Sequence, residues 1–102
     1  MTRKIKLATI ERKVRLLNDL TGNPVKPWYE LRRGQYVAQV GCYHLKRVGG
    51  GMVLKRIIDD QGKAEGVFGL METPRPKETL WLMIEAYMNG YEAGKAAGVS
   101  DD

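Results

Sequence analysis

Residues 36–58 read YVAQVGCYHLKRVGGGMVLKRII, a stretch in which short runs of β-branched and aromatic residues are separated by glycines. Such runs are typical of short strands joined by turns. The segment DDQGK at residues 59–63 predicts a hairpin turn, because Gly62 can take positive φ while an aspartate side chain caps the backbone. The sequence therefore predicts an antiparallel β-meander of three to five strands, at residues 28–32, 36–40, 43–48, 52–58 and 66–70.

A helix is predicted on each side of this meander. Residues 7–20 carry apolar side chains at helical spacing, and Gly22 followed by Asn-Pro supplies a cap and a stop. A second helix is predicted from about Pro76 to about Ala97, with Glu78 in its first turn complementing the helix dipole. The order helix, sheet, helix predicts an α+β fold.

The length and composition predict one domain over residues 1–102. The chain has 102 residues, a length that suits one core but not two. Its 43% hydrophobic and 28% charged residues are close to the average of globular proteins. The basic residues of 1–6 form a leader that need not be fixed to the domain. No apolar run approaches the ~20 residues of a membrane span, so we expect a cytoplasmic protein without a membrane partner.

The net charge of +5 and the pI near 9.5 favour anionic partners without choosing among them. Eleven residues near the predicted strands interleave cations with aromatic rings, which is what stacking on a base and pairing with a phosphate require. The same composition also fits a solvated sheet face. These residues are Lys26, Trp28, Tyr29, Arg32, Arg33, Tyr36, Tyr43, Lys46, Arg47, Lys55 and Arg56.

The sequence contains no constellation typical of an enzyme. Cys42 is the only cysteine and is expected to be a small, partly buried apolar residue, while the only histidine, His44, is expected to be an ordinary strand residue. Asp59 and Asp60 are adjacent, so they are interpreted as turn residues rather than as an acid and base pair. We therefore predict a binding protein with no catalytic residue, cofactor or metal.

Two groups of small residues require a packing explanation. Three glycines at 49–51 indicate either a wide turn or a close approach of another segment, and a phosphate loop is disfavoured because no GxxxxGK[ST] motif or helix follows. Ala86, Gly90, Gly94 and Gly98 recur every fourth residue of the second predicted helix. Each interior glycine costs ~1 kcal/mol relative to alanine, so this ridge indicates either contact with another copy or a frayed helix end.

The glycine-rich pattern over residues 41–91 resembles a group of small bacteriophage proteins. The similarity rests on GCYHL at 41–45, GGGMVL at 49–54, IIDD at 57–60, Gly62, VFG at 67–69 and the following helix. The chain looks like the anti-Thoeris phage sponges, which bind cyclic ADP-ribose signals and related cyclic nucleotides without cutting them and assemble into oligomers. The resemblance implies a host-defence evasion protein that sequesters such a ligand between subunits.

Carried over by position, the resemblance implies a set of ligand-binding residues. Tyr43 and Phe68 are candidate stacking partners, and Arg75 stands where a phosphate-pairing arginine is expected. Asp59 stands where the family pattern has asparagine, and Arg56 is added from the basic and aromatic group. The implied oligomer interface is formed by Ala86, Gly90 and Gly94.

Two other functions remain open. A phage-type inhibitor or regulator could bind a host protein or a nucleic acid through the same basic surface, as anti-CRISPR-like proteins do. A structural homo-oligomer without any ligand is the third interpretation.

Overall fold

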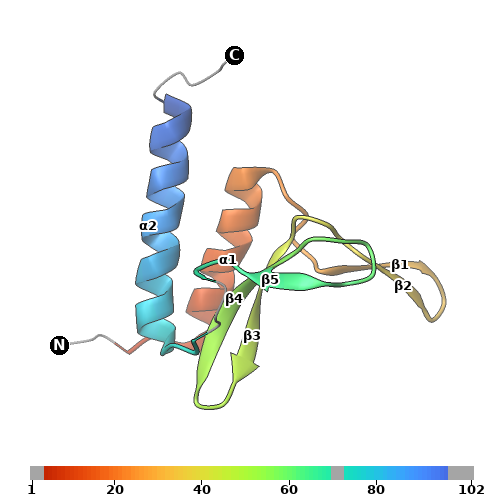
Figure 1. Cartoon of the computed structure of the whole chain (residues 1–102), viewed down its shortest axis with the longest axis horizontal. Helices are drawn as coiled ribbons and strands as arrows, with labels where there is room; N and C mark the ends of the chain where they lie inside the picture. The colour runs from red at the N-terminus through yellow and green to blue at the C-terminus, as the bar shows by residue number, and fades with distance from the viewer. Residues whose placement is uncertain (1–3, 70–72, 97–102) are drawn as a thin grey trace.

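The computed structural model describes residues 4–69 and 73–96, and it has the α+β architecture that the sequence predicts (Figure 1). Two helices lie beside one another, and the strands extend to one side of them. The elements in chain order are α1 (Leu7–Thr21), β1 (Trp28–Arg32), β2 (Gln35–Ala38), β3 (Tyr43–Val48), β4 (Gly51–Ile57), β5 (Ala64–Gly66) and α2 (Lys77–Ala96).

The five antiparallel strands form two sheets, β1-β2 and β3-β4-β5, rather than one continuous meander. The break falls at residues 39–42, where Gly41 takes φ 95° and the chain turns. The last strand is β5, at Ala64–Gly66, two residues earlier than the predicted start at residue 66. The Asp59 turn is short enough for pairing to begin at Ala64, which lies opposite Ile57. Residue 70, the predicted end of that strand, and Ala97 lie outside the described residues.

The two helices run parallel and pack on one face of the three-stranded sheet. Lys13 of α1 forms an ion pair with Glu85 of α2, and its ammonium lies 4.3 Å from the centre of the Trp81 ring. Two residues before α1, the backbone N–H of Ile5 donates to the Glu78 carboxylate at 2.9 Å. Part of the predicted leader is therefore held against the N-terminal end of α2.

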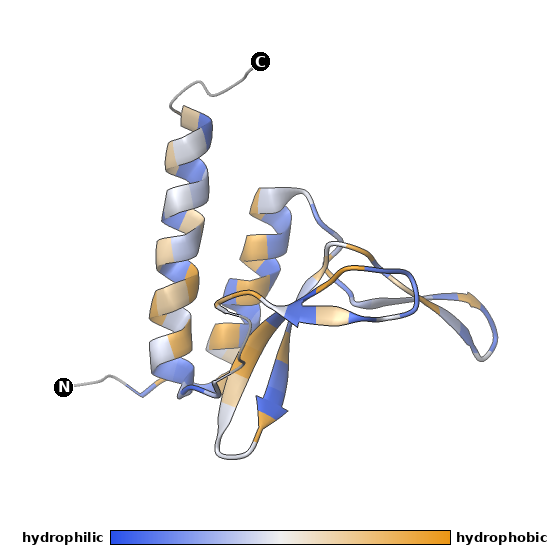
Figure 2. Cartoon of the chain, viewed as in Figure 1, coloured by the Kyte–Doolittle hydropathy of each residue, from blue (hydrophilic) through white to orange (hydrophobic). Residues whose placement is uncertain are grey.

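The main core lies between the helices and the β3-β4 pair. Alternate strand residues face the helices, as the register of a sheet requires. Figure 2 shows the apolar residues along α1, β4 and the first half of α2. The buried members of this core are Ile10, Val14, Leu17, Tyr43, Met52, Leu54, Leu80 and Ile84. Neither helix is long and apolar enough to cross a membrane in the part of the chain that the structure describes.

A buried asparagine fastens α1 to the free edge of β3. Asn18 is 1% exposed, its side-chain amide donates to the Tyr43 carbonyl at 3.0 Å, and its side-chain oxygen accepts from the Tyr43 N–H at 2.8 Å. The helix ends as predicted at Gly22, which takes φ 72° and donates to the carbonyls of the last turn. The side chain of Asn18 thus supplies the partners that a neighbouring strand would otherwise give to Tyr43.

Within the described residues, the β1-β2 hairpin is attached to the rest of the molecule at its base. A second buried cluster, formed by Ala38, Cys42 and Ile57, joins β2 to the three-stranded sheet. The ring of Trp28 lies so close to Gly62 that an added Cβ would be 2.7 Å from it. Beyond this base the hairpin projects away from both helices (Figure 1).

Candidate anion-binding site

The glycine turn explains one of the two groups of small residues. Val48 pairs with Gly51, so Gly49 and Gly50 form a two-residue turn and the wide turn is wrong. A Cβ on Gly51 would lie 2.9 Å from both the backbone nitrogen and the backbone oxygen of Arg75. The close approach of another segment is therefore the correct interpretation for Gly51, whereas Gly49 and Gly50 face open space.

The approaching segment is the loop that leads into α2. The Met52 N–H donates to the Arg75 carbonyl at 2.9 Å, and the Arg75 N–H donates to the Met52 carbonyl at the same distance. This two-bond bridge holds the first turn of α2 beside the turn between β3 and β4.

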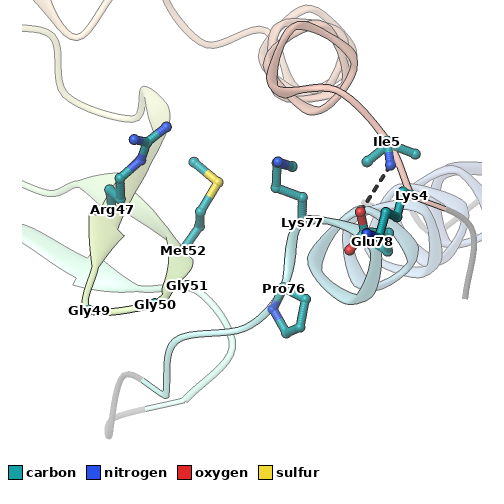
Figure 3. Close-up of a pocket in the computed structure, with 10 residues that line it drawn as sticks. All are labelled: Lys4, Ile5, Arg47, Gly49, Gly50, Gly51, Met52, Pro76, Lys77 and Glu78. Carbon is teal, nitrogen blue, oxygen red and sulfur yellow. Dashed lines mark hydrogen bonds between the residues drawn. The ribbon is translucent and has the colours of Figure 1, made fainter.

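A cavity of about 560 Å³ lies between the glycine turn, the N-terminal end of α2 and the segment before α1. It is lined by Lys4, Ile5 and Arg47 and by residues 49–52 and 76–78, and we call it the cationic cavity. Figure 3 shows the side chains of Arg47, Met52 and Lys77 pointing the same way from three different elements. Its volume falls within the usual range of small-molecule sites, roughly 300–1,000 Å³.

The charges of this cavity favour an anion. Its lining contains three cations, Lys4, Arg47 and Lys77, and a single carboxylate, Glu78. The hydrogen bond from the Ile5 backbone N–H lowers the pKa of Glu78 and holds its oxygen at the cavity wall. The positive end of the α2 dipole points to the same place. Gly49 and Gly50 are exposed and carry no side chain that would keep an anion from the backbone.

Three of the predicted ligand-binding residues do come together, but away from this cavity. The hydroxyls of Tyr43 and Tyr87 are 2.9 Å apart, the Phe68 ring lies 5.8 Å from that of Tyr87, and the Arg56 guanidinium lies 5.3 Å from the centre of the Tyr43 ring. Burial, and then the hydrogen bond to Tyr87, raises the pKa of Tyr43 to about 12. Only 4% of Tyr43 is exposed, so its ring offers no open face for a base in the single chain.

The structure places Asp59 and Arg75 at opposite ends of β4. The Asp59 carboxylate accepts hydrogen bonds from the backbone of Gln61 and Lys63 at 3.0 and 2.9 Å, and Gly62 takes φ 97°, which confirms the predicted turn. Arg75 pairs with Met52, roughly 20 Å away along the strand.

Arg75 and Phe68 meet only at a second recess, between the start of β4 and the segment after β5. This recess has a volume of about 10 Å³. That is no more than one water molecule needs. The single chain therefore does not gather Asp59, Phe68 and Arg75 into a nucleotide-sized pocket.

The predicted interface residues lie on an uncovered side of α2. Ala86, Gly90 and Gly94 are all exposed, and a Cβ on either glycine would meet nothing within 4 Å. Both glycines belong to the helix, which continues to Ala96, so the frayed end is wrong for these two positions. Gly98 lies outside the described residues.

The sulfur and imidazole groups have the structural roles expected of them. Cys42 is fully buried, more deeply than predicted, and burial raises the pKa of its thiol. His44 lies on β3, and partial burial lowers its pKa. Within residues 4–69 and 73–96, no group of three or more His, Cys, Asp or Glu side chains could hold a metal ion.

Sequence reasoning missed two of the three cavity cations. Arg47 was among the basic and aromatic residues, but Lys4 belonged to the leader and Lys77 to the start of a helix. Only the glycine triplet at residues 49–51 pointed to the site, because it indicated that another segment approaches its backbone.

Comparisons with protein-family models, with curated proteins and with solved structures find no match to this chain. The kinship with phage sponges therefore stays a prediction.

Proposed function

We propose that this chain is a binding protein that sequesters a small phosphorylated ligand, of the cyclic-nucleotide or ADP-ribose-derived class, without hydrolysing it. The observation that carries this proposal is the cationic cavity, which is lined by Lys4, Arg47 and Lys77 together with an uncovered glycine turn. Arginine and lysine head groups form strong charge-assisted hydrogen bonds to phosphate oxygens. A role in evading host defence follows from the resemblance described above.

The lining of the cavity supports binding rather than turnover. It includes no serine, threonine, cysteine or histidine side chain that could act as a nucleophile or a general base. Its single carboxylate, Glu78, already accepts the Ile5 N–H. A phosphate ester held there would be neutralised and positioned, and the one carboxylate beside it would be a weak base for water because its pKa is lowered.

Removal of two cavity cations is expected to abolish high-affinity binding. We expect the double variant Arg47→Gln/Lys77→Gln to bind cyclic ADP-ribose or a cyclic dinucleotide at least about 100-fold more weakly, because each of the two charged hydrogen bonds contributes ~1.5–3 kcal/mol. Native mass spectrometry against a panel of such ligands, followed by calorimetry on the best, measures this. The measurement also reports any cleaved product.

The matched control is Arg12→Gln/Arg15→Gln, which removes two exposed cations from α1 and so changes the net charge equally. Its ligand affinity should stay within a few-fold of the original. Equal losses in both double variants would show that the net charge, and not the cavity, attracts the ligand. If the unaltered protein binds none of the panel, the sequestration proposal is wrong.

We also propose that the ridge of Ala86, Gly90 and Gly94 joins copies of the chain. Gly90→Leu is expected to lower the mass in sedimentation, because small residues allow the close helix approach that a leucine would block. The control is Asn89→Leu, an exposed position about 100° further round the helix. An unchanged mass for Gly90→Leu would leave this ridge without an interface role.

A further inference from the structure

The longest unbroken run of exposed residues in the described chain lies in the β1-β2 hairpin. Every residue from 28 to 36 is exposed, on both strands and in the turn between them. Three large side chains on it are more than half exposed: Tyr29 at 56%, Leu31 at 60% and Tyr36 at 59%. Apolar and aromatic surface gathered in this way marks an interaction site rather than a scatter of surface residues.

The base of the hairpin is held by hydrogen bonds and packing. The exposure of residues 28–36 is therefore not that of a loose segment. The Gln39 N–H donates to the Pro27 carbonyl at 2.8 Å, and the Ala38 N–H donates to the Asp60 carbonyl at 3.3 Å. Trp28 packs on Gly62, and Ala38 is 2% exposed. The fold thus presents a fixed arm whose outer part does not contribute to either buried cluster.

The register of the hairpin sets its two faces. A bulge lies between Glu30 and Arg32, and it places Arg32 opposite Gln35. Tyr29 lies opposite Val37, so Tyr29 and Arg32 are on one face. Tyr36 lies opposite Glu30, on the other face. Each face of the arm therefore presents one tyrosine.

The charge of the arm is positive. Lys26, Arg32 and Arg33 outnumber the single acidic residue, Glu30, and one oxygen of Glu30 accepts the Gly34 N–H at 3.3 Å. Arg33 lies in the turn at the tip, next to Arg32. The arm therefore combines two guanidinium groups at its tip with one exposed tyrosine on each face.

We propose that the β1-β2 hairpin binds single-stranded nucleic acid, with the rings of Tyr29 and Tyr36 stacking on bases and Arg32 and Arg33 pairing with phosphates. Exposed rings beside cations are what an unpaired strand requires, because each base has a free face and each linkage a negative charge. A duplex hides its base faces from such rings. A second copy of the arm would bring four arginines together, which like charges oppose.

This site is independent of the cationic cavity. None of the cavity residues belongs to β1 or β2, and the arm projects from the opposite side of the sheet to the helices (Figure 1). If ligand binding at the cavity is disproved, the proposal for the hairpin is unaffected, and the reverse also holds.

The test is fluorescence anisotropy of a labelled 20-nucleotide oligothymidylate at several salt concentrations. Tyr29→Ala/Tyr36→Ala is expected to bind at least about 20-fold more weakly, because loss of each stacked ring typically weakens binding about fivefold or more. Arg32→Gln/Arg33→Gln should reduce the slope of log affinity against log salt by about 1.4, since each phosphate contact on a single strand contributes about 0.7.

Two comparisons make the result decisive. Tyr29→Phe/Tyr36→Phe keeps the rings and should keep the affinity, which separates stacking from any loss of folding. Arg12→Gln/Arg15→Gln on α1 should leave the salt slope unchanged. An oligonucleotide that does not bind at low salt would overturn the proposal and favour a protein partner for the arm. Equal competition by a duplex of the same length would overturn it as well.

Discussion

Replacement of Asn18 by leucine is expected to lower the free energy of unfolding by about 2 kcal/mol or more. The side chain is 1% exposed and makes two hydrogen bonds to the backbone of Tyr43. Leucine has a similar volume but leaves the buried Tyr43 N–H without a partner and the Tyr43 carbonyl with only the weak Cys42 thiol donor at 3.4 Å. A buried polar group without a partner costs ~1–3 kcal/mol, and the loss of the second hydrogen bond adds to this. Because β3 is an edge strand of its sheet, no neighbouring strand can take over these bonds.

Urea unfolding followed by circular dichroism measures this difference. The matched control is Asn89→Leu, the same chemical change at an exposed position of α2, which should alter stability by no more than about 0.5 kcal/mol. Equal transition midpoints for the Asn18 variant and the original protein would show that the Asn18 bonds to Tyr43 contribute little. A loss confined to Asn18→Leu would show that this amide contributes to the attachment of α1 to β3.

Local signals in the sequence were sufficient for the elements themselves. The helix predicted at residues 7–20 is Leu7–Thr21, and its stop at Gly22 follows from the left-handed φ that glycine adopts readily. The turn at 59–63 also depends on two nearby residues only, Asp59 and Gly62. Such features are set within a few residues, so sequence alone determines them.

The division into two sheets could not be predicted in this way. Residues 36–40 have a strand composition, yet β2 ends at Ala38 because the chain must turn at Gly41 to bury Cys42 beside Ile57. The burial of Asn18 depends equally on long-range packing. A polar residue near the end of a helix is normally expected in solvent, and only the edge of β3 accounts for its position.

The basic and aromatic residues show the same limit for function. Composition placed Tyr29, Tyr43 and Arg47 in one group, whereas in the structure they lie in three separate regions. Tyr29 lies on the exposed hairpin, Tyr43 in the core and Arg47 at the cationic cavity. The locations of these three residues depend on the alternation of side chains along the strands and on the turn at residues 39–42. Neither can be obtained from composition.

Gly51→Ala is expected to destabilise the fold by about 2–4 kcal/mol and to weaken ligand binding at the cationic cavity. The new Cβ would lie 2.9 Å from two backbone atoms of Arg75 and 3.1 Å from the Pro74 carbonyl carbon. A backbone cannot rotate away as a side chain can, so the loop before α2 has to move. That movement strains or breaks the two hydrogen bonds between Met52 and Arg75 and displaces Lys77 from the cavity.

The neighbouring Gly50 provides a matched control, because the same added methyl group there meets nothing within 4 Å and the backbone φ is not positive. Gly50→Ala should be neutral or stabilise by up to about 1 kcal/mol, since alanine restricts the unfolded chain. Thermal unfolding separates the pair, because 2–4 kcal/mol corresponds to a fall of roughly 10 °C or more in Tm. Equal Tm values would refute the close approach at Gly51. A destabilised Gly51→Ala that still binds its ligand at full affinity would instead move the binding site away from this cavity, because Lys77 reaches the cavity only while the bridge between Met52 and Arg75 holds.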